Sequence, residues 1–180
     1  MGLVNDQFGE YCIHYLKRID GSADVDYNSE LKGTLKVKEF YKGKNIFITG
    51  CTGFLAKVIL EKLFRTCPEI GKIYIMVRPK RKVTPMSRIE KEILTSQCFD
   101  RVIKSMGQKE FKEFARSKII PIQGDLIVEG LGISAEDHEL IINETDIFIN
   151  SAASVNFDDP LKDALNINYF GAQRMLTLAK

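Results

Sequence analysis

The fold is decided by residues 45–56, which read Asn45-Ile46-Phe47-Ile48-Thr49-Gly50-Cys51-Thr52-Gly53-Phe54-Leu55-Ala56. The apolar run from Ile46 to Ile48 contains β-branched residues and is typical of a strand that is buried on both faces. Two glycines interrupt this run, and a helical spacing begins at Phe54. The stretch therefore predicts a strand, a glycine turn and a helix. The residues that recur at helical spacing are Phe54, Leu55, Val58, Ile59, Lys62 and Leu63.

A turn of this kind is suited to binding an anion. The first N–H groups of a helix have no partner within the helix, and the helix dipole adds roughly half a positive charge there. Gly50 permits the tight turn, Gly53 lets a pyrophosphate approach the backbone, and Ala56 takes the third small position of the dinucleotide fingerprint. A plain strand-to-helix connection is the alternative. The strand and helix on either side favour a dinucleotide site.

The composition indicates an ordinary globular domain. The 180 residues are 44% hydrophobic and 28% charged, and the net charge of +2 is too small to indicate a nucleic-acid partner. No apolar run approaches the roughly 18 residues that a membrane span requires. We expect no metal site, because the four cysteines lack the spacing of metal ligands; as free thiols they suit a reducing, intracellular compartment.

The whole chain alternates between predicted strands and helices. This alternation predicts an α/β fold with a Rossmann-like, doubly wound parallel sheet, incomplete at about four strands of the usual six or seven. The expected strand order is 3-2-1-4, with the ligand crevice between the first and fourth strands. We expect an N-terminal extension over 1–38 and an NAD(P)-binding domain over 39–180. The later strands are expected at 72–77, 118–123 and 146–150, and helices within 86–117, from Ser134 and over 163–180.

A basic cluster at 78–82 follows the second strand directly. Such a cluster can be a solvated turn, but its place matters more than its charge. At this point a dinucleotide fold contacts the ribose with an acid or meets a 2′-phosphate with arginine. No Asp or Glu occurs from Arg78 to Ile89, so the sequence favours NADPH over NADH.

The quoted stretch, from Thr49 to Ala56, resembles the cofactor turn of the extended short-chain dehydrogenase/reductases. Over about residues 39–180 the chain resembles, more narrowly, the alcohol-forming fatty acyl-CoA reductases. The resemblance implies a set of cofactor contacts and one supporting residue. These are the pyrophosphate turn of Thr49, Gly50, Cys51, Thr52, Gly53, Phe54 and Leu55, Arg78 and Arg88 at the 2′-phosphate, Asp125 and Leu126 at the adenine, Ala152 and Ala153 at the nicotinamide half, and Asn168 as a supporting residue. The motifs that carry the resemblance are that turn, Glu39–Lys44, Glu61–Leu63, Cys67-Pro68, Tyr74–Arg78, Gly124–Leu126 and Ala152–Asp158.

The activity implied by the resemblance is the NADPH-dependent reduction of long-chain acyl-CoA, through an aldehyde, to a fatty alcohol. The family's catalytic Tyr-x-x-x-Lys pair is expected beyond Lys180, because none of the six tyrosines has a lysine four residues later. We therefore expect residues 1–180 to be inactive alone and to represent the front half of the enzyme. The resemblance also implies a cytosol-facing protein associated with the peroxisome or endoplasmic reticulum membrane. A non-catalytic dinucleotide-binding module is the alternative. A sugar-nucleotide epimerase is disfavoured by the long crossover after Arg88.

Overall fold

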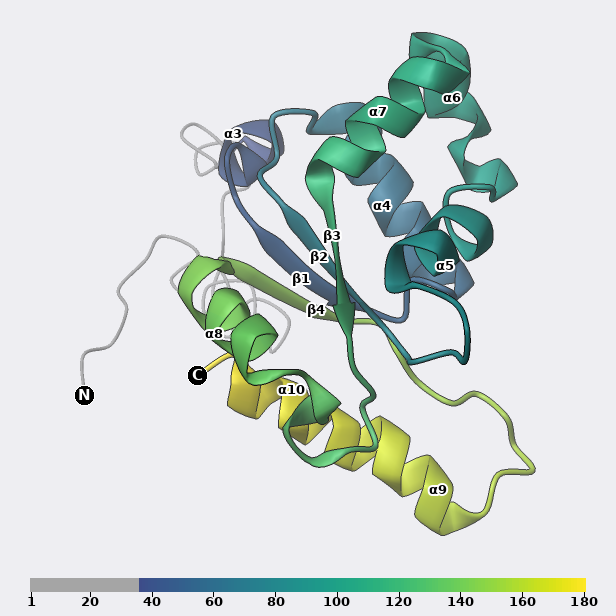
Figure 1. The fold of residues 1–180 in the computed structure, drawn as a ribbon, viewed down its shortest axis with the longest axis vertical. Coiled ribbons are helices and arrows are strands. Elements are labelled where there is room, and N and C mark those ends of the chain that lie inside the picture. Colours follow the sequence, from purple (N-terminus) through teal and green to yellow (C-terminus); the bar gives the residue numbers. More distant parts are fainter. Residues whose placement is uncertain (1–35) are drawn as a thin grey trace, which may run out of the picture. The chain divides into compact units, whose positions relative to one another are not determined.

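The computed structural model describes residues 36–180, in which Val37–Lys180 form one compact unit. Most of the extension predicted over 1–38 lies outside the described residues. In the described part, a parallel sheet of four strands has the order β3-β2-β1-β4 (Figure 1), which confirms the predicted fold class and strand order. The strands are β1 (Ile46–Thr49), β2 (Ile73–Val77), β3 (Ile119–Gln123) and β4 (Ile147–Asn150).

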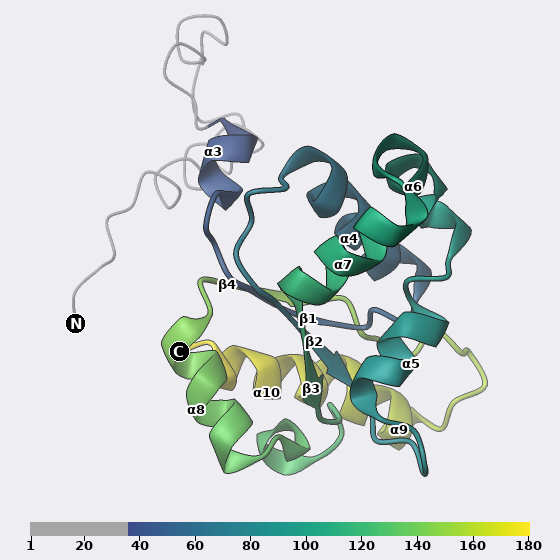
Figure 2. The same ribbon diagram turned by 45° about the horizontal axis from the view of Figure 1, so that its top comes forward.

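Helices cover both faces of this sheet (Figures 1 and 2). One layer consists of α4 (Phe54–Thr66), α5 (Pro85–Glu92), α6 (Asp100–Met106) and α7 (Gln108–Lys118). The other layer consists of α8 (Ala135–Glu144) and a long C-terminal helix built from α9 (Leu161–Leu165), η3 (Asn166–Phe170) and α10 (Gly171–Leu178). The remaining elements are short: α3 (Val37–Tyr41), η1 (Gln97–Phe99) and η2 (Glu129–Gly132).

Successive strand residues point into two separate cores. In β1, Ile46 and Ile48 contact the core beneath α4 to α7, whereas Phe47 contacts the core beneath α8 and α10. In β2, Ile73 and Ile75 alternate in the same way with Tyr74. Since the side chains of a strand alternate between its two faces, a strand with both faces covered must be largely apolar, as β1 and β2 are.

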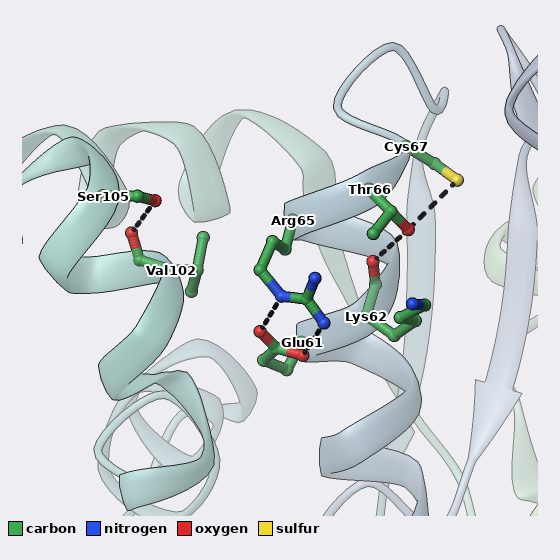
Figure 3. Close-up of polar contacts among 7 residues, drawn as sticks. All are labelled: Glu61, Lys62, Arg65, Thr66, Cys67, Val102 and Ser105. Carbon is green, nitrogen blue, oxygen red and sulfur yellow. Dashed lines mark hydrogen bonds and ion pairs between the residues drawn. The ribbon is translucent and has the colours of Figure 1, made fainter.

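The residues that recur at helical spacing from Phe54 coincide only partly with the buried face of α4. Phe54 and Leu55 are 79% and 62% exposed, because they lie in the first turn of the helix, just past the end of β1. The buried face of α4 is formed partly by other residues of the helix, and it includes a charged side chain, Glu61. Glu61 accepts a hydrogen bond from Arg65 Nε at 2.6 Å on the side of α4 that faces α6 (Figure 3). The buried residues of α4 are Ala56, Leu60, Glu61, Leu63 and Phe64.

The C-terminal helix begins earlier than predicted and is not uniformly α-helical. Its first segment, α9 (Leu161–Leu165), starts two residues before the expected start at Asp163. A π-helical turn, η3 (Asn166–Phe170), follows and continues into α10 (Gly171–Leu178). A π turn accommodates one extra residue, and hydrophobic spacing does not reveal it. Among the described residues, no helix has the length and apolar character needed to cross a membrane.

The helix that follows η2 starts as the sequence predicted. Ser134 Oγ accepts a hydrogen bond from the Asp137 N–H at 3.1 Å, which caps the N-terminus of α8. The N-terminus of α5 has a similar cap that was not predicted, in which Thr84 Oγ1 accepts from the Ser87 N–H at 3.2 Å. Both caps fix the direction in which a helix leaves the sheet.

Candidate functional site

A cleft of about 350 Å³ opens at the carboxyl ends of the strands. It brings together most of the residues that the sequence predicted for the cofactor, from four segments far apart in the chain. Of the predicted residues, those that line it are Gly50, Cys51, Thr52, Gly53, Arg78, Arg88, Asp125, Leu126, Ala152 and Ala153.

The glycine turn forms one wall of this cleft and is held close to the segment after β4. Gly50 has φ +75°, a conformation that favours glycine, and a Cβ atom there would lie 2.6 Å from the Ala152 nitrogen. The Gly53 N–H donates to the Gly50 carbonyl at 2.8 Å and closes the turn. No larger residue fits at Gly50 without separating the ends of β1 and β4.

The N-terminus of α4 is left open by this turn. Gly53 is the N-cap and supplies no side-chain hydrogen bond, and no acidic residue lies in the first helical turn. The first N–H groups are thus neither capped by a side chain nor neutralised by a carboxylate. The turn can therefore receive an anion.

Cys51 gives the turn a neutral lining. Its side chain is buried, and burial raises the pKa of the thiol to about 12. The thiol therefore stays protonated near neutral pH and adds no negative charge beside the helix N-terminus. A lowered pKa, which a reactive cysteine would need, is absent at this position.

Thr49 lies behind the cleft and does not line it. This residue is fully buried, and its Oγ1 donates to Asn150 Oδ1 at 2.5 Å. The same Oγ1 accepts a hydrogen bond from the Ala152 N–H at 3.3 Å. Thr49 therefore ties the end of β1 to the segment after β4, and this tie positions the backbone of Ala152.

Two arginines line the cleft beyond β2. Arg88 Nη1 donates to the Arg78 carbonyl at 2.6 Å, and Arg88 Nε donates to Glu92 Oε2 at 3.0 Å. Glu92 also accepts from Lys80 Nζ at 3.1 Å, and the hydrogen bonds from Lys80 and Arg88 lower the pKa of its carboxyl group. Arg88 is thus fixed in place, while the Arg78 side chain is exposed.

The loop after β3 forms the opposite wall. The Asp125 N–H donates to the Leu131 carbonyl at 2.7 Å, and Asp125 Oδ1 accepts from the Ile127 N–H at 3.3 Å. At Gly124 a Cβ atom would lie 2.8 Å from the Leu131 carbonyl oxygen, so the loop can close only around a glycine. The side chain of Leu126 is 5% exposed and fixed in the core.

Asn168 does not line the cleft, but it holds a residue that does. Asn168 Oδ1 accepts from the Ser154 N–H at 2.8 Å, and Asn168 Nδ2 donates to the Ser154 carbonyl at 2.9 Å. The amide thus pairs with both backbone groups of one residue in the segment after β4. This geometry fits the supporting role expected for Asn168.

Other lining residues were not predicted for the site. Phe54 and Leu55, which were predicted, are exposed and do not line the cleft. Ser151 contributes by its backbone, since its carbonyl carbon would lie 2.6 Å from a Cβ at Gly50. A signal was available for the strand ends, because the carboxyl ends of neighbouring parallel strands meet at one edge. The lining residues that were not predicted are Met76, Val77, Ile127, Ser151, Ser154 and Ile167.

A second cavity, of about 750 Å³, is lined by residues of η2, α8, η3 and α10. None of the residues predicted for the cofactor line it, and it contains the apolar side chains of Leu131, Phe170 and Leu178 beside His138 and Arg174. The first cavity therefore matches the predicted chemistry, although it is the smaller of the two.

A family model for an NAD-binding domain, described as male sterility protein, matches residues 48–180. The chain belongs to this family. The match includes every segment that lines the cleft, from the glycine turn to the C-terminal helix.

Curated relatives of this chain are named as fatty acyl-CoA reductases, the enzymes that the sequence resembles. The chain is 42% identical to fatty acyl-CoA reductase 1 of Mus musculus over 146 residues, which are 81% of this chain and 27% of the relative. It is 35% identical to the chloroplastic fatty acyl-CoA reductase 2 of Arabidopsis thaliana over 150 residues, covering 83% of this chain and 24% of the relative. The chain thus spans about a quarter of the length of these relatives.

Solved structures with a similar fold include reductase domains of biosynthetic assembly lines. The terminal R domain from the myxalamid PKS-NRPS pathway has a TM-score of 0.58 and 27% identity, covering 87% of this chain and 38% of that one. The R domain of a non-ribosomal peptide synthetase from Mycobacterium tuberculosis has a TM-score of 0.56 and 25% identity, covering 76% and 30%. These matches and the male sterility protein family confirm the Rossmann-like fold, the resemblance to fatty acyl-CoA reductases and a nicotinamide cofactor.

Proposed function

We propose that the strand-end cleft binds NADPH and that the protein reduces long-chain fatty acyl-CoA to a fatty alcohol through an aldehyde. One observation carries the proposal: the open N-terminus of α4 and the two arginines line the same cleft. Negative charge is favoured at both places, and NADPH carries it at two points, the central pyrophosphate and the 2′-phosphate of the adenosine. The 42% identity to a fatty acyl-CoA reductase supports the substrate class.

The residues present fit a dinucleotide. The cleft leaves no room for a Cβ atom at Gly50, and a Cβ at Gly53 would lie 3.1 Å from the Gly50 carbonyl oxygen, so both positions keep the backbone bare. The N–H groups at the start of α4 would hold the pyrophosphate, as the dinucleotide fingerprint requires. NADPH, when bound, supplies the hydride for the thioester and aldehyde carbonyls.

In this proposal, each of the other walls of the cleft contacts a different part of the cofactor. Arg78 and Arg88 would hold the 2′-phosphate, with Arg88 kept in place by Glu92 and the Arg78 carbonyl. Asp125 and Leu126 would contact the adenine. Ala152 and Ala153 are small, so the nicotinamide half can lie close to their backbone, which Asn168 steadies through Ser154.

A non-catalytic dinucleotide-binding module is a second candidate, favoured by one observation. None of the six tyrosines in residues 1–180 is followed four residues later by lysine. Both candidates require the cleft to bind the cofactor, and reduction of acyl-CoA by the full protein separates them. We also propose that the NAD(P)-binding domain begins after residue 38 and that the protein associates with a peroxisomal or endoplasmic reticulum membrane.

The test of the cofactor is a calorimetric titration of the full chain with NADPH and with NADH. Arg78→Ala should weaken NADPH binding about ten- to hundredfold, because a charged hydrogen bond to the phosphate is lost, and leave NADH binding unchanged. Arg81→Ala is the matched control, since Arg81 is exposed and does not line the cleft. Equal affinities of the wild type for the two cofactors would contradict the proposal.

A further inference from the structure

We infer that Arg174 is a positioning residue that joins two walls of the cofactor cleft, the loop after β3 and the segment after β4. The inference rests on the proposed function. Arg174 lies on α10, outside the cleft, and contacts neither the glycine turn nor Arg78. Its guanidinium group instead reaches the loop after β3 and the π turn η3. These two segments support opposite sides of the site.

Arg174 donates hydrogen bonds through one nitrogen, Nη1, to three oxygen atoms. Arg174 Nη1 lies 2.9 Å from the Leu126 carbonyl oxygen, which belongs to the wall proposed for the adenine. It also lies 3.3 Å from the Asn166 carbonyl oxygen and 3.1 Å from Asn166 Oδ1, in the first residue of η3. Arg174 therefore links the adenine wall to the π turn directly.

The π turn in turn determines the other wall. The backbone N–H of Gly171 donates to the Asn166 carbonyl, five residues earlier, which is the spacing of a π turn. Asn168 lies within this turn and pairs with both backbone groups of Ser154. A change in the geometry of η3 thus moves Asn168, and with it the segment that follows β4.

Helix geometry explains why a residue so far along the chain can make this link. Side chains of a helix point back toward its N-terminus, so a long side chain at position 174 extends toward Asn166. Gly171 lies between the two, and a Cβ atom there would be 3.2 Å from Leu126 Cβ. The helix and the loop are therefore packed closely enough for one guanidinium group to contact both.

The charge of Arg174 is balanced by oxygen dipoles. Among the described residues, no carboxylate lies within ion-pair distance of Arg174, and its partners are carbonyl and amide oxygens. A planar guanidinium presents several N–H donors in a fixed arrangement, whereas an ammonium group presents a point charge. Lysine should keep part of the link, and methionine should lose it.

The experiment compares the full chain with Arg174→Met and Arg174→Lys. Calorimetry measures binding of NADPH and of adenosine 2′,5′-bisphosphate, and hydrogen exchange measures protection of the Ser154 N–H. Arg174→Met should bind both ligands about tenfold more weakly and exchange the Ser154 N–H faster, and Arg174→Lys should lie between it and the wild type. Arg116→Met is the matched control, because Arg116 pairs with Glu90 on the other face of the sheet.

The outcomes separate this inference from the proposed function. Wild-type protein that binds neither ligand contradicts the proposed function, whereas faster exchange at Ser154 in Arg174→Met still supports the link between the walls. Unchanged affinity and unchanged exchange in a folded Arg174→Met would overturn the inference, as would an effect of Arg116→Met of the same size. If Arg174→Met does not fold, Arg174→Lys decides by the same two measurements.

Discussion

The strands of the sheet are joined mainly by side-chain hydrogen bonds at one end and mainly by close backbone contact at the other. At the end where the strands begin, side chains link the strands. Asn45 Oδ1 accepts from the Lys72 N–H at 2.6 Å, and Asn45 Nδ2 donates to the Glu144 carbonyl at 2.8 Å. Asp146 accepts from both the Asn45 N–H and Lys44 Nζ at 2.8 Å.

At the end where the strands finish, the segments approach one another mainly through backbone, although side chains such as those of Arg78 and Arg88 also line the cleft. Gly50 lets the segment after β4 approach, and Gly124 does the same for the loop after β3. Side chains also link β1 to β4 at this end, since Thr49 Oγ1 donates to Asn150 Oδ1, but Thr49 is buried under the cleft and not in it. The two ends therefore differ in their main means of joining the strands, which is side-chain hydrogen bonds where the strands begin and close backbone contact at glycines where they finish.

The largest effect is expected for Gly50→Ala at the end where the strands finish. The new methyl group would lie 2.6 Å from the Ala152 nitrogen, and φ +75° strains any residue with a Cβ. We expect a loss of about 2–4 kcal/mol in the free energy of unfolding, measured by urea denaturation, together with loss of NADPH binding. Gly43→Ala is the control, since Gly43 also has positive φ (+70°) but no atom lies within 4 Å of its Cβ position. Equal losses in both variants would show that strain alone, and not the close approach, matters.

A smaller effect, confined to stability, is expected for Asn45→Ala at the linked end. The variant loses the hydrogen bonds to Lys72 and Glu144, which solvent can partly replace. The free energy of unfolding should fall by about 1–2 kcal/mol. The calorimetric affinity for NADPH should stay within twofold of the wild type, since Asn45 is at the far end from the cleft. A large loss of affinity would contradict the separation of the two ends.

The sequence predicted the elements that depend on local pattern. The strands, the glycine turn and the Ser134 cap follow from periodicity and residue type within a few neighbours, and the strand order follows from the usual topology of a doubly wound sheet. Arg88 and Asn168 were identified only through family resemblance, because the groups that they hold outside their own helices, the Arg78 carbonyl and the backbone of Ser154, are set by tertiary packing. Two features were missed for the same reason.

These two features are the buried face of α4 and the π turn η3. Phe54 and Leu55 are apolar, yet they lie beyond the end of the sheet, where there is no core to bury them. The π turn is accompanied by tertiary contacts from Arg174 and Gly171 to Leu126, which lies 48 positions before Arg174 in the chain. No spacing rule within the helix contains that information.

The smallest effect is expected for Asp146→Asn, and it depends on pH. Partial burial opposes ionisation of Asp146, but hydrogen bonds from Lys44 and the Asn45 N–H, with the charge of Lys44, lower the pKa of its carboxyl group. A lowered folded pKa stabilises the protein above the unfolded pKa of about 3.9, and this contribution is lost as the pH falls through the folded pKa. At pH 7 the variant should be less stable by about 1 kcal/mol, since the pair is partly exposed.

The pH dependence tests the linked end of the sheet more sharply than the size of the effect does. Urea denaturation should show a constant difference between wild type and Asp146→Asn above about pH 5, and the difference should shrink as the pH falls below about 4. Asp158→Asn is the control at the other end of the sheet, where the carboxylate is exposed on the loop after β4. A difference that persists unchanged at pH 3 would mean that Asp146 acts through its shape and hydrogen bonds, which asparagine replaces poorly, and not through its charge. The link between β1 and β4 would then depend on shape and hydrogen bonds at this end, as it depends on the hydrogen bonds of Thr49 at the other.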